Sequence, residues 1–188
     1  MPLVEDAAHA RLRSPQAVAR RAIVLYGLAA IGHDANKAQV VNSWKEAGVR
    51  TDLSPSERAF VEAESVTKQE RANATWRVEA LWVLLWALGL IDTLAFPDQP
   101  CDVDRIHSLI PKPHEANSFI ESAKLRDVEG ILDETDKIYR IHWAVREAQL
   151  KSAVAPAELD AGVVEERHYA LNWLTWYADD WDEITTDT

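Results

Sequence analysis

Apolar residues recur along most of the chain with the three- and four-residue spacing of amphipathic helices, and no stretch shows a convincing two-residue strand period. Capping residues, prolines and glycines divide this pattern into segments. We therefore expect an all-α fold, a compact irregular multi-helix bundle. The predicted helices cover about residues 15–31, 37–47, 55–62, 68–88, 115–124, 128–150 and 163–178, with one helical turn near 103–109 inside a proline-rich loop (96–114).

Helix ends are marked most clearly in the first half of the chain. A Ser-Pro pair at 14–15 is typical of an N-cap followed by the first helical residue. The sequence Ser-Pro-Ser-Glu at 54–57 is a capping box with proline in the same place. Gly32, Gly48 and Gly89 each follow an apolar segment, so we expect each to lie just past a helix end.

The most apolar run of the chain, ALWVLLWALGLI at 80–91, lies in the predicted helix 68–88. Its 12 residues are too few to span a bilayer. Because this part of the helix is apolar all round, we expect it to be central in the bundle. A length of 188 residues predicts a single helical domain, 1–188.

Composition narrows the function classes. The chain has 20 basic and 31 acidic residues, a net charge of -11, which argues against nucleic-acid binding. Its single cysteine, Cys101, excludes an internal disulfide and suits a reducing compartment. The first 14 residues contain no apolar signal-peptide core. We expect a cytoplasmic protein that binds neither nucleic acid nor membrane.

Several charged residues fall inside apolar helical stripes. In the helix predicted at 128–150, His142 and Arg146 lie one turn apart near the middle of the apolar arc. In the last helix, Arg167 lies at the centre of the aliphatic arc, and in the central helix Glu79 opens the apolar segment two residues after Arg77. A lone charge in a dry interior costs several kcal/mol or more, so we expect these charges to be paired.

The simplest pairing brings the three helices together. Glu79 would accept hydrogen bonds from Arg146 or Arg167, with His142 and His168 nearby. Because the cations outnumber Glu79, further carboxylates are needed, and part of the acidic C-terminus could fold back, anchored by Trp181. The other candidates are Asp92, Asp136 and Glu166.

Three interpretations of this cluster stay open. It could be a structural ion network that fixes helix register, or a polar pocket whose surplus positive charge holds an anionic ligand. Alternatively, an arginine could lay its stem on the core and keep its head in water. If the cluster is a pocket, the candidate ligand-binding residues are Arg77, Glu79, His142, Arg146, Arg167, His168 and Asn172.

Motifs for cofactor or metal chemistry are scarce. One E-x-x-H sequence ends at His168, whereas a di-iron bundle needs two copies. A mononuclear metal site of His142, His168 and Glu165 is the weaker alternative, and we predict no metal and no cofactor. No phosphate-binding glycine loop or nucleophile elbow is present. Cys101 stands beside Asp102, which would raise its pKa and disfavour a nucleophilic role.

The chain has a group of arginines near its N-terminus and an unusually large number of tryptophans. We expect the four N-terminal arginines to lie on a solvated helix face; they are Arg11, Arg13, Arg20 and Arg21. The 8 tryptophans are abundant for this length. We expect most of them to fill the core between small alanine surfaces, with an aromatic pocket wall as the alternative.

The chain also resembles a known family. The segments that carry the resemblance are SPQAVARRA (14–22), LSPSERAF (53–60), TWRVEALWVLLWALGLID (75–92), LRDVEGILDETDKIYRIHWAVREAQL (125–150), GVVEERHYALNWL (162–174) and WDEITTDT (181–188). In their order they resemble the bacterial domain of unknown function 4272, over nearly the whole chain. The resemblance implies a mostly helical, cytoplasmic, stand-alone bacterial protein without an assigned activity or catalytic residue. Its motif positions are Trp76, Arg77, Glu79, Trp86, Tyr139, Arg140, His142, Trp143, Arg167, His168, Asn172, Trp173, Trp181 and Asp182.

Two functional hypotheses follow. The first is a non-enzymatic cytoplasmic domain acting through protein contacts, an accessory or immunity-like protein whose negative charge suits a basic partner. The second is an enzyme or small-ligand binder with an anion- or metal-binding pocket lined by Arg, His, Glu and Trp.

Overall fold

The computed structural model describes residues 10–188, and within them it contains eight α-helices and no strand, which confirms the all-α prediction. Short 3-10 turns (η1–η4) connect some of the helices. The helices are α1 (Pro15–Gly32), α2 (Lys37–Glu46), α3 (Pro55–Glu62), α4 (Lys68–Ala87), α5 (Val103–Leu109), α6 (Ala116–Ser122), α7 (Val128–Leu150) and α8 (Ala161–Leu174), and the turns are η1 (Arg50–Asp52), η2 (Pro113–Glu115), η3 (Pro156–Glu158) and η4 (Trp181–Glu183).

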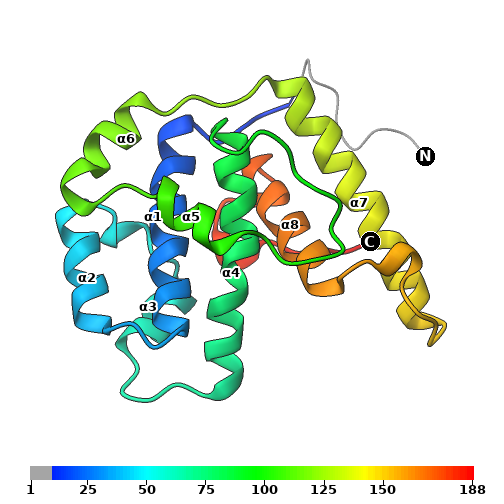
Figure 1. Ribbon diagram of the computed structural model, residues 1–188, viewed down its shortest axis with the longest axis horizontal. Coiled ribbons are helices and arrows are strands. Elements are labelled where there is room, and N and C mark those ends of the chain that lie inside the picture. Colours follow the sequence, from blue (N-terminus) through cyan, green and yellow to red (C-terminus); the bar gives the residue numbers. More distant parts are fainter. Residues whose placement is uncertain (1–9) are drawn as a thin grey trace.

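Helix α4 lies in the middle of the fold, as its apolar run predicts. It packs against α1 on one side and α8 on the other, and α7 covers α8 at the edge of the molecule (Figure 1). Between Ala80 and Ala87 every residue of α4 except Trp82 is buried. This burial places α4 at the centre of the apolar core.

Local capping chemistry sets most helix ends. The capping box of α3 is formed by Ser54 and Glu57 as predicted, and Ser14 caps α1. Gly48 (φ +68°) and Gly89 (φ +74°) adopt left-handed conformations just past α2 and α4.

Gly32 has a different role from the one predicted. It lies inside the last turn of α1, and the residue with positive φ is Asp34. A Cβ on Gly32 would lie 2.8 Å from the Thr75 side chain and 2.9 Å from its backbone nitrogen. Gly32 is therefore needed because α1 and α4 approach closely, not because the helix ends there.

The last helix is displaced from its predicted range of 163–178. It begins at Ala161, since Asp160 accepts hydrogen bonds from the backbone of Gly162 (2.9 Å) and Val163 (3.1 Å). It ends at Leu174, because the chain turns at Trp176, where φ is +61°. Helix α6, Ala116–Ser122, is also shorter than predicted.

The early end of α8 frees the chain to return along the protein. Trp181 and Ile184 are buried in the core, so the tail after α8 is anchored as predicted. In Figure 1 the tail passes α4 and α8 and ends beside α7.

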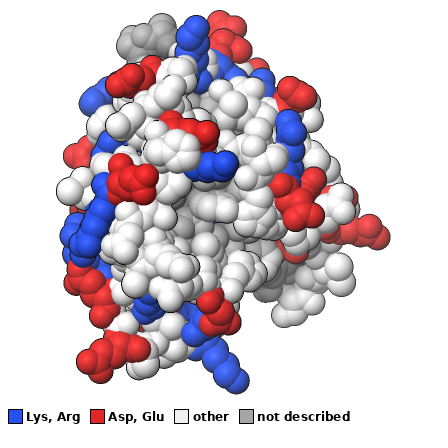
Figure 2. Space-filling model, turned by 60° about the vertical axis from the view of Figure 1, so that its left-hand side comes forward, with Lys and Arg blue, Asp and Glu red and all other residues white. Residues whose placement is uncertain are grey.

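On the face drawn in Figure 2, Lys and Arg are interspersed with Asp and Glu, mostly around an uncharged middle. Among residues 10–188, no helix has both the length and the apolar character required for a membrane span.

Candidate functional site

Glu79 and Arg167 meet in the interior between α4 and α8. Glu79 is fully buried, and Arg167 Nε lies 3.8 Å from its Oε2 atom. Burial lowers the pKa of Arg167, and the charge of Glu79 opposes that shift. Of the two predicted partners for Glu79, the structure selects Arg167.

This pair also holds the loop that follows α4. Glu79 Oε1 accepts the backbone N–H of Cys101 at 2.6 Å, and Arg167 Nη1 donates to the carbonyl of Ala95 at 2.6 Å. Burial, then the charge of Glu79, raises the pKa of the Cys101 thiol. The direction agrees with our prediction, but the neighbouring charge is Glu79 rather than Asp102, which caps α5. A thiol in this setting is a poor nucleophile.

Arg77 pairs with Glu166, one of the predicted extra carboxylates. Arg77 Nη1 lies 3.1 Å from both carboxylate oxygens, and its guanidinium stands 4.9 Å from the centre of the Tyr169 ring. Arg77 therefore belongs to a second α4–α8 ion pair, separate from that of Glu79.

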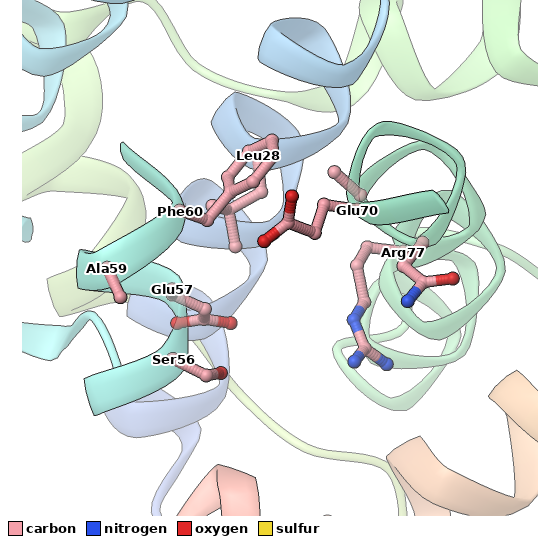
Figure 3. A pocket seen from close by; sticks show the side chains of 9 residues that line it. Leu28, Ser56, Glu57, Ala59, Phe60, Glu70 and Arg77 are labelled. Atoms are coloured by element: carbon pink, nitrogen blue, oxygen red, sulfur yellow. The ribbon is translucent and has the colours of Figure 1, made fainter. Parts of the chain in front are cut away.

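A pocket of about 370 Å³ lies between α3 and α4 (Figure 3). Glu57 and Phe60 approach it from α3, and Glu70 and Arg77 from α4. Each charged group already has a partner. Glu57 binds Arg21, Glu70 Oε2 accepts the backbone N–H and the hydroxyl of Thr67, both at 2.7 Å, and Arg77 binds Glu166.

His142 and His168 form a buried pair between α7 and α8. Their Nδ1 atoms lie 2.8 Å apart and their rings are perpendicular, so one ring donates its Nδ1–H to the other. Burial, then His142, lowers the pKa of His168 to about 4. Burial also lowers the pKa of His142; Glu165 opposes this shift and Arg146 adds to it. Because both pKa values are lowered from the usual 6.5, both rings are uncharged at neutral pH.

The tail closes over this histidine pair. Asn172 donates to the carbonyl of Thr185 at 2.8 Å, and a pocket of about 260 Å³ is lined by His142, Arg146, Glu165 and residues 186–188. Asn172 thus acts as a tether for the tail.

Arg146 does not join the buried charges, so the prediction was wrong for this residue. It is exposed, and its Nη1 donates to Gln149 of the same helix at 2.9 Å. The apolar stripe of α7 is not buried along its whole length, since Leu150, one turn later, is 83% exposed. Arg146 therefore fits the third interpretation, in which the guanidinium group stays in water.

The other two predicted carboxylates, Asp92 and Asp136, do not join the buried charges. Asp136 pairs with Arg140 on its own helix at 2.6 Å, and the Asp92 side chain is exposed. For the metal alternative, no group of three or more His, Cys, Asp or Glu side chains in the described range 10–188 is arranged to hold an ion.

The sequence analysis missed a buried ion pair between α1 and α3. Arg21 is 4% exposed, binds both carboxylate oxygens of Glu57, and lies 3.9 Å from the ring centre of Trp181. The expectation of a solvated face was therefore wrong for Arg21. Helical spacing could have found it, because Arg21 shares a stripe with Val18 and Leu25.

Arg13 is buried as well, again against our expectation. It donates to the carbonyls of Trp173 (3.0 Å), Ala178 (2.5 Å) and Asp179 (2.9 Å), and stacks on Trp176. No periodicity predicts this contact, since Arg13 precedes the first helix and its acceptors lie about 160 residues later.

Asp182 fastens the returning tail to the start of α3. Its Oδ1 accepts the hydroxyls of Ser54 and Ser56 at 2.7 Å, and its Oδ2 accepts the Ser56 backbone N–H at 2.8 Å. Tyr169 donates to the carbonyl of Trp181. Together with the contacts of Arg13 and Asn172, these hydrogen bonds hold the tail to the core at several points.

Apart from Arg146, the predicted site residues thus divide into three arrangements: the Glu79–Arg167 pair, the Arg77–Glu166 pair and the His142–His168 pair with Asn172. Charged groups that neutralise one another in the interior fix helix register and hold loops.

Comparison with the curated proteins and with the solved structures gave no match. A family model, described as domain of unknown function (DUF4272), matches residues 1–184. The chain therefore belongs to the DUF4272 family, as the six sequence segments indicated.

Proposed function

We propose that this protein is a non-enzymatic binding domain of the bacterial cytoplasm, and that it docks a basic protein partner through the outer face of α7. Glu79, Arg77 and His142 are already paired with Arg167, Glu166 and His168, and this internal pairing supports a binding role rather than a catalytic one. The free thiol of the single cysteine, Cys101, supports a reducing compartment. The family resemblance supports a bacterial source.

The observation that carries the proposal is the exposed apolar surface of α7. Trp143 is 48% exposed and Leu150, at the end of the helix, 83%; Val154, in the loop that follows, is 92% exposed. Exposing large apolar side chains to water costs free energy, and aromatic side chains are enriched at the centres of protein interfaces. Helix α7 is also accessible, because its main helical contact is with α8.

The net charge of the chain favours a basic partner. At 100° per residue, three carboxylates lie within 40° of Trp143 on the helix, at Glu129, Asp136 and Glu147. Two of these carboxylates already have a cation, since Asp136 pairs with Arg140 and Glu147 with Lys151. The exposed Arg146 lies about 60° from Trp143 on the other side. Charges on the face itself are therefore nearly balanced, and the preference for a basic partner rests on the net charge of the chain, -11.

A pull-down with matched variants tests the proposal. The wild-type protein, Trp143→Asp and Phe96→Asp are immobilised and exposed to lysate of the source organism at low and high salt. Phe96 is the control, since it is 45% exposed on the loop after α4. Any captured protein is then purified and titrated against all three forms.

We expect one basic protein to bind the wild type and Phe96→Asp, and to be lost with Trp143→Asp. Its affinity should fall as salt rises, because screening weakens complementary surface charges. An acidic partner, or one that binds Trp143→Asp equally well, would contradict the proposal, as would finding no specific partner.

A further inference from the structure

Helix α7 is attached to the rest of the protein unevenly. It lies at the edge of the molecule, and its main helical contact is with α8 (Figure 1). Its first half buries four side chains, those of Ile131, Leu132, Thr135 and Ile138. Between residues 143 and 160, all of them described, Val145 is the one buried side chain. We call residues 142–158 the α7 arm, and this arm is held to the core by few side chains.

The outer part of the α7 arm is exposed and strained. Leu150 and Val154 stand largely in water. Left-handed backbone conformations, which cost free energy in residues with a Cβ atom, occur at Ser152 (φ +50°), Ala157 (φ +54°) and Glu158 (φ +59°). A segment with few buried contacts and a strained turn has low local stability. The α7 arm can therefore open more easily than the rest of the fold.

Within residues 10–188, one side-chain hydrogen bond joins the α7 arm to α8. It links His142 to His168, whose Nδ1 atoms lie 2.8 Å apart in the interior. The other side-chain hydrogen bonds of the arm in this described range, which involve Arg146 and Lys151, stay within the arm. The histidine pair is therefore the polar side-chain contact that holds the arm on α8.

Protonation changes this contact in two steps. In the uncharged pair one ring donates its Nδ1–H and the other accepts with its Nδ1 lone pair. A first extra proton goes to the unprotonated Nε2 atom of the donating ring and leaves the hydrogen bond intact. A second must go to the accepting Nδ1 atom, so that two N–H groups face each other. The ring centres are 5.1 Å apart, and the two buried positive charges then repel one another.

The groups around the pair come from α7, α8 and the tail. Glu165 on α8 favours protonation of the histidine in the arm, and Arg146 on α7 opposes it. Asp187 in the tail favours protonation of His168, and the Tyr139 ring of α7 meets His168 edge-on. Burial outweighs the favourable charges and lowers the pKa of both histidines.

We propose that the His142–His168 pair is an acid-sensitive latch, which holds the α7 arm on α8 at neutral pH and releases it in acid. The first half of α7 and the core around α4 stay packed, because apolar burial holds them. Release needs no partner, so it is independent of the docking proposed for the outer face of α7.

Acid favours release because protons bind the released arm more tightly. With the arm closed, burial and the charge of His142 keep the pKa of His168 at about 4, whereas in water an imidazole has its ordinary value of 6.5. For His168 alone, the equilibrium constant for release therefore rises about twentyfold between pH 7 and pH 5. His142, whose pKa is also lowered, adds to this effect.

The test is hydrogen exchange of the full chain at pH 7 and pH 5, read by mass spectrometry for peptides from the α7 arm, the first half of α7 and α4. Protection factors, which compare each observed rate with that of an unstructured chain, remove the direct effect of pH on exchange. His168→Asn keeps an amide where Nδ1 stands and cannot be protonated. His33→Asn is the matched control, since His33 is exposed at the end of α1.

We expect the α7 arm to be less protected than α4 at both pH values. In the wild type and in His33→Asn, protection of the arm should fall about twentyfold or more from pH 7 to pH 5. In His168→Asn the fall should be about twentyfold smaller than in the wild type, because only His142 still titrates.

Equal protection of the α7 arm and α4 at both pH values would overturn the proposal, since the arm would then open only with the whole fold. Protection of the arm that does not fall with pH, or that falls equally in the wild type and His168→Asn, would also overturn it. If His168→Asn does not fold, His142→Asn replaces it with the same expected outcome.

Discussion

Two regions of this protein bury charged groups in opposite ways. In the inner cluster, which consists of Glu79, Arg167, His142 and His168, each group faces a partner from another helix. Where the start of α1 meets the returning tail, the buried Arg13 donates only to the backbone carbonyls of Trp173, Ala178 and Asp179. Both regions bury a charge, but only the inner cluster pairs it with an opposite charge. A substitution in the inner cluster therefore leaves a buried charge unpaired, whereas a substitution of Arg13 leaves only neutral carbonyls without a donor.

The largest effect should come from breaking the inner cluster. Arg167→Ala leaves the fully buried Glu79 without its counter-ion, and we expect the free energy of unfolding to fall by about 2–4 kcal/mol. Denaturant unfolding at pH 7 measures the loss. Arg146→Ala is the control: that exposed residue should cost under about 0.5 kcal/mol. Equal costs would remove the distinction between the two arginines.

Lowering the pH should also weaken the inner cluster. The pKa of His168 is about 4 in the folded protein, against 6.5 for an unperturbed histidine, so the unfolded chain binds protons first. Stability from this group is complete above pH 6.5 and is lost as the pH falls towards 4. At pH 5 the loss should be about 2 kcal/mol.

Unfolding of the wild type, His168→Phe and the exposed control His33→Gln at pH 7 and pH 5 measures this contribution. The difference between the two pH values should shrink in His168→Phe and persist in His33→Gln. If all three proteins lose the same stability, the histidine pair is not responsible.

Arg13, at the start of α1, should matter less for stability than Arg167. Arg13→Gln leaves carbonyl groups without a donor but no buried carboxylate without a cation, so we expect a cost of about 1–2 kcal/mol. The same unfolding assay applies. A cost above that of Arg167→Ala would reverse the comparison.

The smallest effect should come from the attachment of the tail. Asp182→Ala removes the acceptor at the start of α3, and loss of such a cap costs about 1 kcal/mol. The neighbouring, exposed Glu183→Ala is the control and should cost less than about 0.5 kcal/mol. Thermal unfolding of both variants distinguishes them.

Helix existence and position could largely be predicted, because the signals are local. The capping box at Ser54 and Glu57, the left-handed Gly48 and Gly89, and the apolar run of α4 each depend on residues a few positions apart. Gly32 shows the limit of such reasoning, since its role comes from the tertiary approach of Thr75.

The site could be predicted only in part, for a related reason. Spacing on a helix shows that Arg167 and Glu79 face a core, and it led to their pairing. It does not show how far that core extends, so Arg146, near the exposed end of α7, was misplaced. Contacts between distant segments, such as those of Arg13 and of Asp182, leave no periodic trace.

A double-mutant cycle between Glu79 and Arg167 tests most directly whether the inner cluster contains a stabilising ion pair. The free energies of unfolding of the wild type, Glu79→Gln, Arg167→Gln and the double variant give the coupling between the two side chains. We expect a coupling of about 2 kcal/mol or more, because each single change leaves the other charge buried and unpaired. A coupling within about 0.5 kcal/mol of zero would mean that the two side chains do not stabilise one another.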